Sequence, residues 1–215
     1  MVKKIKELNG QILISKKEID LFSDRKRVNL INSLSGYKSA NLVATIDENG
    51  KTNVSIFNSV FHLGASPALI GFIIRPDVSR RDTLNNLRLN GLCTINHVNS
   101  DIYKNAHQTS ARYNQDESEF DECNLTTEFL DEFKAPFVKE SFIKFSVKML
   151  REEVIPENGT HMIIGEIQNI YLPDNCLTTD GSIDINQAKT ICVSGLDTYF
   201  ECNLIEKLQY AKKNK

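Results

Sequence analysis

The chain has 215 residues, of which 40% are hydrophobic and 25% are charged, and its formal net charge is −2. This composition is typical of a globular protein that is long enough to bury a sizeable core. The near-neutral charge gives no long-range attraction to nucleic acid or to an anionic membrane, and no stretch reaches the roughly 20 apolar residues of a membrane-spanning helix. We therefore expect neither nucleic acid nor a membrane as a partner.

The cysteines and histidines follow no pattern of a structural site. Five cysteines are an odd number and include no C-x-x-C pair, which argues against a disulfide framework and against a thiolate zinc site. The four histidines are scattered without metal-ligand spacing, so we predict no metal site. The first residues, MVKKIKELNG, lack the apolar run of a signal peptide. Together these features predict a cytoplasmic protein with ordinary thiols.

The first half of the chain predicts two helices followed by strands. Helical patterns cover 16–22 and 25–34, and strands are predicted at 40–47 and 51–60. Glu48-Asn49-Gly50 lies between these strands, and Asn-Gly between strand patterns is a strong hairpin signal. The apolar run 68–75 predicts a buried strand, and a helix from Asp82 to the Gly91 stop precedes a strand at 92–98.

The second half predicts a long hairpin and further short elements. A helix is expected at 101–111, a loop or weak helix at 112–124, and paired strands at 141–155 and 160–172 around a turn at 156–159. A last strand near 190–196 and an amphipathic stretch complete the chain. Some six strands in hairpins with peripheral helices predict a mainly β fold, a closed or partly closed antiparallel barrel. The regular strand–helix alternation of a doubly wound parallel sheet is missing.

One candidate site lies at the start of the helix that follows residue 81. Arg80, Arg81 and Thr83 surround unpaired backbone N–H groups, an arrangement that suits a phosphate. Cations at a helix N-terminus are otherwise mildly unfavourable. The alternative is that Asp82 caps the helix while both arginines lie in water or pair with carboxylates. Asp82 would repel a phosphate unless it is turned away or paired with an arginine.

A second candidate is the strand after the Asn-Gly turn. Alternation places Asn53, Ser55 and Ser59 on one face and Asn58 on the other, and such amides and hydroxyls can bind a ligand. The alternative is that the first face is simply solvent-exposed. Neither standard nucleotide-binding loop is present, and no serine nucleophile motif of the form G-x-S-x-G occurs.

The order of these segments resembles the flavin reductase-like family, whose members bind FMN in a split β-barrel. The resemblance rests on ANLVATIDENGKTNVSIFNSV, SPALIGFIIRP and RRDTLNNLRLNGLCTINHV, and on the late hairpin with its Gly-Glu-Ile close. It covers about residues 25–175, so we expect one family domain over 1–215 with a core at 25–175 and terminal extensions. The chain departs from the family pattern at 124–126 and at GYKSAN, which bears on substrate preference more than on fold.

The resemblance implies roles for individual residues. Arg80, Arg81, Asp82 and Thr83 would hold the FMN phosphate, and Asn53, Ser55, Asn58 and Ser59 would line the ribityl chain and the ring. Asn96 and His97 would flank the flavin, and His161 would border the nicotinamide side. No catalytic side chain stands out, because in such a reaction the cofactor carries the chemistry.

The resemblance further implies a flavin reductase that passes hydride from NAD(P)H to FMN, with FAD as the alternative cofactor. Electrons would continue to a bound acceptor or a partner monooxygenase, and the protein would be a homodimer. Two other hypotheses remain: a non-enzymatic FMN-binding or redox-sensing protein, and a split-barrel oxidase that acts on a pyridoxal-type phosphate. The identity of the bound cofactor and turnover with a nicotinamide separate the three.

Overall fold

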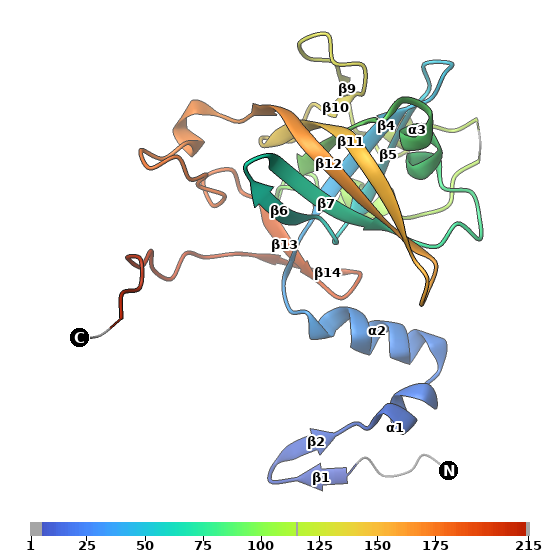
Figure 1. Ribbon diagram of the computed structural model, residues 1–215, viewed down its shortest axis with the longest axis vertical. Coiled ribbons are helices and arrows are strands. Elements are labelled where there is room, and N and C mark those ends of the chain that lie inside the picture. Colours follow the sequence, from blue (N-terminus) through green and yellow to red (C-terminus); the bar gives the residue numbers. More distant parts are fainter. Residues whose placement is uncertain (1–5, 115, 214–215) are drawn as a thin grey trace.

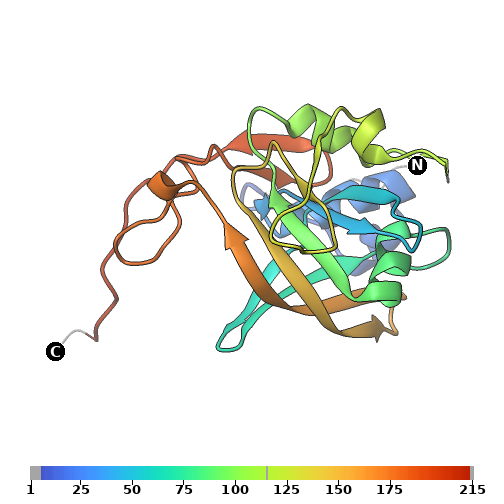
Figure 2. The ribbon, with the colours of Figure 1, turned by 90° about the horizontal axis from the view of Figure 1, so that it is seen from above.

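A seven-stranded antiparallel sheet dominates the computed structural model, which describes residues 6–114 and 116–213. Its strands, in spatial order, are β5 (Thr52–Phe57), β4 (Asn41–Ile46), β8 (Leu92–His97), β11 (Lys144–Ile155), β12 (Thr160–Tyr171), β7 (Ala68–Ile74) and β6 (Phe61–Ala65). The sheet curls into a barrel (Figure 1; Figure 2). Its edge strands β5 and β6 are not paired with each other in the described part of the chain, so the barrel is split there. The predicted partly closed antiparallel barrel is confirmed.

Shorter elements surround the barrel. The small sheets consist of β1 (Lys6–Leu8) with β2 (Gln11–Leu13), β9 (Thr127–Glu128) with β10 (Phe137–Val138), and β3 (Lys38–Ser39) with β13 (Ile191–Ser194) and β14 (Thr198–Glu201). The helices are α1 (Lys16–Asp20), α2 (Asp24–Leu34), α3 (Asp82–Asn90), α4 (Tyr103–Gln108), α5 (Glu119–Glu122) and the 3-10 turn η1 (Asp174–Cys176). No helix among the described residues is long and apolar enough to cross a membrane.

Local chemistry explains the elements that the sequence predicts best. In the β4–β5 turn, Oδ1 of Asp47 accepts hydrogen bonds from the backbone N–H groups of Asn49 and Lys51, both at 2.8 Å, and Gly50 has a φ of +82°. Helix α3 ends at Gly91, whose φ of +72° lets its N–H reach the carbonyl of Leu87 at 2.8 Å. Both signals act over a few residues and are therefore visible in the sequence.

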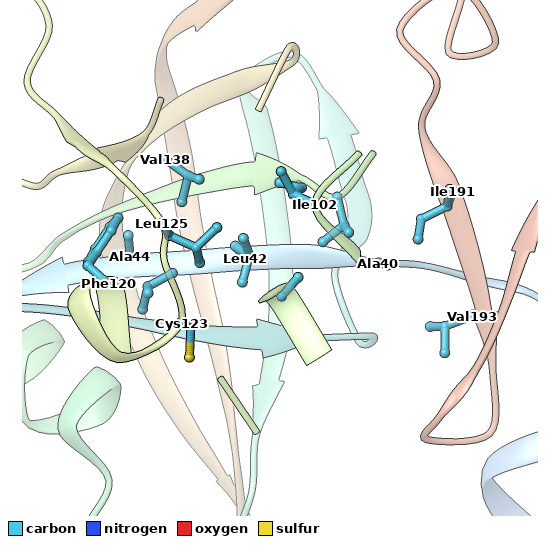
Figure 3. Close-up of a cluster of buried hydrophobic side chains, with 13 residues drawn as sticks. Ala40, Leu42, Ala44, Ile102, Phe120, Cys123, Leu125, Val138, Ile191 and Val193 are labelled. Carbon is cyan, nitrogen blue, oxygen red and sulfur yellow. The ribbon is translucent and has the colours of Figure 1, made fainter. Parts of the chain in front are cut away.

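Two apolar clusters cover the two faces of the sheet. The inner cluster fills the barrel and includes Val43 from β4, together with Leu84 and Leu87 from α3. The outer cluster contains the neighbours of Val43 on β4, Leu42 and Ala44, which α4, α5 and the segments around them cover (Figure 3). Because successive residues of a strand face opposite sides, β4 contributes to both clusters. Helix α3 thus packs against the barrel interior, and this packing fixes where its N-terminus lies.

Several segments differ from the sequence prediction. The predicted strand 51–60 ends at Phe57, and 61–65 forms the separate strand β6. Strands β1, β2 and β14 follow no clear alternation, and the predicted amphipathic stretch near the C-terminus has no regular structure over 202–213. Residues 6–34 extend away from the barrel as an arm, in which neither α1 nor α2 has a buried residue (Figure 1).

Candidate functional site

The start of helix α3 is the first candidate site. Arg81 is the N-cap residue, and no side chain caps the helix. The carbonyl of Arg81 accepts the first helical hydrogen bond, from the N–H of Asn85 at 2.9 Å. The N–H groups of the first turn have no intrahelical acceptor, and they point out of the helix end together with its partial positive charge. Such an end favours an anion.

The two arginines at this start have different surroundings. Arg80 pairs with Asp82, with 2.5 Å between Nε and Oδ1, so the carboxylate is compensated by its neighbour. Asp82 is the first helical residue and not the cap. The Nε of Arg81 is buried and has no hydrogen-bond partner among the described residues. The sequence left open whether these arginines pair with carboxylates or face a bound anion. Arg80 pairs with a carboxylate, whereas Arg81 retains an unsatisfied buried donor.

A buried polar cluster holds this helix start against the sheet. The amide nitrogen of Asn53 donates to the hydroxyls of Thr45, at 3.2 Å, and of Thr83, at 3.1 Å. Asn86 also donates to the Thr45 hydroxyl, at 3.0 Å. Asn53 and Thr83 are therefore hydrogen-bonded directly to each other. Sequence analysis missed Thr45 and Asn86, although Asn86 follows Thr83 by three residues and so shares its helix face.

The other predicted residues of this region, Ser55, Asn58 and Ser59, lie at different positions along the strand and have different contacts. Ser55 is half-buried in the middle of β5, and its hydroxyl has no side-chain hydrogen bond to a described residue. The amide of Asn58 donates to the carbonyl of Gly195 at 2.9 Å. The Ser59 hydroxyl bonds both the carbonyl and the N–H of Ile73, at 3.1 and 3.2 Å. Asn58 and Ser59 thus tie the end of this strand to neighbouring segments.

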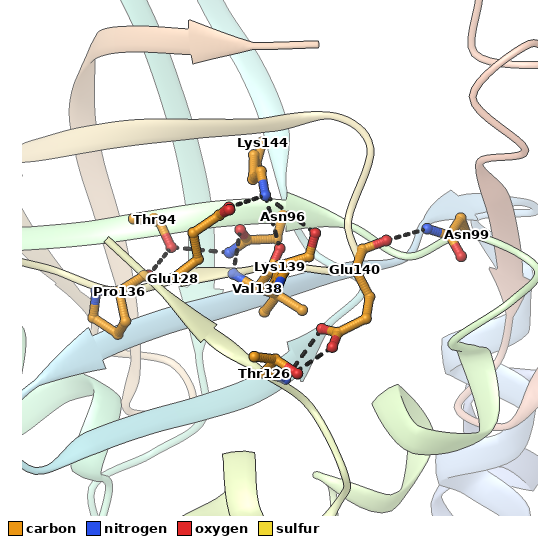
Figure 4. A network of polar contacts seen from close by, with 10 residues as sticks. All are labelled: Thr94, Asn96, Asn99, Thr126, Glu128, Pro136, Val138, Lys139, Glu140 and Lys144. Carbon is orange, nitrogen blue, oxygen red and sulfur yellow. Dashed lines mark hydrogen bonds and ion pairs between the residues drawn. The ribbon is translucent and has the colours of Figure 1, made fainter. Parts of the chain in front are cut away.

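Asn96 differs from its predicted role beside a ligand. Its side chain is fully enclosed, and it donates to the Leu42 carbonyl at 3.1 Å and to the Thr94 hydroxyl at 2.9 Å. Its oxygen accepts the N–H of Val138 at 3.0 Å (Figure 4). Because every one of these contacts is internal, Asn96 joins β8 to β4 and β10 and offers no polar atom to a ligand.

His97 follows Asn96 at the end of β8 and is partly buried. Its ring lies edge-on to Phe145, with the ring centres 6.4 Å apart, and its Nδ1 is 3.4 Å from the Thr190 hydroxyl. Burial lowers the pKa of His97 to about 4, so the ring is neutral at pH 7. In register, both Phe57 and His97 lie opposite Asn41 of β4. His97 therefore lies at the Asn58 end of the strands, whereas Asn53 lies at the α3 end.

His161 belongs to a charged network at the side of α3. Its Nδ1 lies 2.6 Å from Oε1 of Glu152, and both oxygens of Glu152 also accept hydrogen bonds from Arg88 of α3. Arg88 first, and His161 to a smaller extent, lower the pKa of Glu152. His161 pairs in register with Ile74 at the end of β7, where the chain enters the segment that carries Arg80 and Arg81. This network was not predicted, since it joins residues 64 positions apart.

Comparisons with known proteins agree with this architecture. The family model described as "Flavin reductase like domain" matches residues 35–187, more than half of the chain. A crystal structure from Shewanella frigidimarina NCIMB 400, of a protein assigned as a flavin reductase with a split barrel domain, is 51% identical, covers 94% of this chain and 100% of its own, and has a TM-score of 0.91.

Two more distant proteins are also similar to this chain. Nitrilotriacetate monooxygenase component B from Bacillus cereus is 20% identical over 94% of this chain and 100% of its own, with a TM-score of 0.80. A protein of Aquifex aeolicus (strain VF5) whose function is not assigned is 26% identical over 149 residues, 68% of this chain and 74% of that protein. The chain therefore belongs to the flavin reductase-like family, which implies flavin binding, and has the split-barrel fold of its relatives.

Proposed function

We propose that this protein is an FMN-dependent oxidoreductase that takes hydride from NADH or NADPH and passes electrons to an acceptor. The observation that carries the proposal is the start of α3, where a buried Nε of Arg81 lacks a partner beside uncapped N–H groups. An unsatisfied buried donor costs free energy, and an anionic ligand would remove that cost. When bound, the flavin supplies the hydride and electron chemistry, which the protein orients and tunes.

The residues around α3 would have different roles in binding the cofactor. Arg81 and the first-turn N–H groups would contact the phosphate, while Arg80 neutralises Asp82 at the edge of the site. Asn53 and Thr83 act as positioning residues, because their hydrogen bond holds the helix start on β5. Ser55 lies two residues further along β5, about 7 Å from Asn53, where the ribityl chain would follow.

We assign His97 to a position beside the flavin ring and His161 to the side on which a nicotinamide would bind. A neutral His97 would pack beside the ring without donating a proton at neutral pH, consistent with chemistry carried by the cofactor. His161 is held in one orientation by Glu152, so it would present a fixed edge to a nicotinamide. Asn58 and Ser59 would shape the far end of the site through the backbone contacts that they make.

We also propose a cytoplasmic homodimer that delivers electrons to a separate acceptor, such as a partner monooxygenase. Support for the acceptor comes from the fold shared with the component B of nitrilotriacetate monooxygenase. Support for the dimer comes from the apolar side chains that the arm exposes, among them Leu21 and Leu34, at 79% and 70% exposure.

The first test is the visible absorption spectrum of the purified protein, reconstituted with FMN and desalted, before and after anaerobic NADH and NADPH. A flavin band that bleaches with either nicotinamide is the expected result. A band that persists with both would favour the non-enzymatic FMN-binding alternative. Absence of any band, with no quenching of FMN or FAD fluorescence on titration, would overturn the proposal.

The second test is the affinity for FMN of an Arg81→Met variant. Loss of a charge-assisted contact of about 1.5–3 kcal/mol should weaken binding by about 10- to 150-fold. Arg25→Met, on an exposed residue of the arm, is the matched control and should leave the affinity unchanged. Thr83 is left in place because its hydroxyl also accepts the Asn53 amide. An Arg81→Met protein with unchanged affinity and intact fold would remove the phosphate assignment.

A further inference from the structure

Two of the five cysteines lie next to each other outside the candidate site. The sulfur atoms of Cys192, on β13, and Cys202, which directly follows β14, are 3.1 Å apart. Register explains the contact, since Cys192 lies opposite Phe200 on the paired strand. Cys202 follows Phe200 by two residues, so both thiols point to the same face of the hairpin.

The surroundings give the two thiols different access to solvent. Cys192 is 7% exposed and lies between β3 and β14, with Ser39 of β3 opposite it. Burial and the neighbouring thiol raise the pKa of Cys192 to about 11, so its thiol stays protonated at pH 7. Cys202 is more exposed, because the sheet ends at Glu201. A small oxidant in solvent therefore meets Cys202 first.

Two contacts hold Cys202 and the segment that follows it in place. In the amide orientation that satisfies both groups, the side chain of Asn186 donates to the Cys202 carbonyl at 3.2 Å and accepts the N–H of Leu204 at 3.1 Å. Lys207 pairs with Asp180, with 2.5 Å between Nζ and Oδ2. These contacts hold Cys202 beside Cys192, and a disulfide of about 2 Å between the sulfurs needs a shift of about 1 Å.

We propose that Cys192 and Cys202 form a reversible dithiol–disulfide site that is oxidised by low-molecular-weight disulfides. The thiolate of Cys202 attacks one sulfur of the small disulfide and releases one thiol, which leaves a mixed disulfide on Cys202. The sulfur of Cys192 then attacks Sγ of Cys202, loses its proton to the departing thiolate, and releases the second thiol. In total, two protein thiols are oxidised and one small disulfide is reduced to two thiols.

The other cysteines serve as internal controls. Cys93, Cys123 and Cys176 are buried, and no thiol within bonding reach accompanies any of them in the described part of the chain. Reversible disulfides in cytoplasmic proteins are typically redox-responsive and not structural. The proposed site does not depend on flavin binding, so the two proposals fail independently.

The test uses the purified full chain, incubated with oxidised glutathione or with dithiothreitol, then denatured, alkylated with iodoacetamide and digested with trypsin. Both cysteines fall in one tryptic peptide, residues 190–207. We expect this peptide to carry two alkyl groups after reduction. After oxidation it should carry none, and its mass should be two hydrogen atoms below that of the unmodified peptide with two free thiols. The peptides of Cys93, Cys123 and Cys176 should stay alkylated.

Two variants check the order of steps. Cys192→Ser should accumulate one glutathione on Cys202, because the resolving sulfur is missing. In Cys202→Ser, Cys192 should remain a thiol. If the oxidised wild-type peptide 190–207 instead carries two alkyl groups, or two glutathione groups, the proposed site is overturned. This measurement on the wild-type chain does not require either variant to fold.

Discussion

At Gly165, strand β12 passes so close to β11 that any side chain would collide with it. A Cβ at this position would lie 2.3 Å from Cγ1 of Val147 and 3.2 Å from the carbonyl oxygen of Lys148. Val147 is fully buried in the inner cluster, so it has no space into which to move. The glycine is therefore required by packing between the two long strands, next to the register shift between Met149 and Arg151.

Gly165→Ala should accordingly destabilise the protein. Overpacking of this kind costs about 1–3 kcal/mol, which for a chain of this size lowers the melting temperature by roughly 2–4 °C per kcal/mol. Thermal and denaturant unfolding measure the effect. The matched control is Gly64→Ala on the edge strand β6, where a Cβ would lie at an ordinary 3.5 Å from the carbonyl of Pro67. Equal stabilities of the two variants would contradict the packing argument.

At the scale of elements, α3 is fastened to the β11–β12 hairpin by charge. Arg88 contacts Glu152 through two hydrogen bonds of 2.9 and 2.6 Å and Asp77 through one of 3.0 Å. Glu152 is the more enclosed partner, with 17% of its side chain exposed against 41% for Arg88. This link holds the helix from the side, whereas Asn53 and Thr83 hold it at its start.

The Glu152 link predicts a dependence of stability on pH. The pKa of Glu152 is lowered from 4.5 in the folded protein, mainly by Arg88. Its contribution to stability is therefore fully present above about pH 4.5 and is lost as the pH falls through the lower folded pKa. Glu152→Gln should be less stable than wild type at pH 7, and the difference in unfolding free energy should narrow below pH 4.5.

Denaturant unfolding at several pH values measures this difference. The matched control is Glu153→Gln, because Glu153 is 42% exposed and pairs with the exposed Arg151. Surface pairs contribute little, so that variant should follow wild type at every pH. If the loss of unfolding free energy in Glu152→Gln stays constant down to pH 3, the charge of Glu152 does not stabilise the fold.

Elements with local signals were predictable from the sequence, whereas those defined by distant partners were not. The β4–β5 hairpin and α3 depend on Gly50 and Gly91, whose signals act within one turn. Strand β6 exists through its pairing with β7, and its own residues carry a weak pattern. Among the candidate site residues, the arginines before α3 could be singled out because a helix start is a local feature, and their contact with a phosphate stays a prediction. Asn96 was misplaced because its partners, Leu42 and Val138, lie 54 and 42 residues away.

At the scale of the whole molecule, the arm has an apolar face that stays exposed among the described residues of the chain. Asn29 and Ser33 on one side of α2 line a depression shared with the turn of the β13–β14 hairpin. Val28, Ile31 and Leu34, on the other side, are exposed by 40%, 46% and 70%. The polar side of the helix thus faces its own barrel while the apolar side faces outward. An apolar stripe of this kind is commonly buried against another subunit.

The homodimer proposed above should therefore depend on α2. We expect wild type to have twice the chain mass of 24.4 kDa by light scattering, and Val28→Asp with Ile31→Asp to have the mass of one chain. Asn29→Asp with Ser33→Asp adds the same charge to the opposite side of α2 and should remain dimeric. If the second subunit completes the flavin site, the monomeric variant should also bind FMN more weakly than this control does. A wild-type protein that is monomeric at all concentrations would contradict the prediction, and the exposed stripe would then need a different partner.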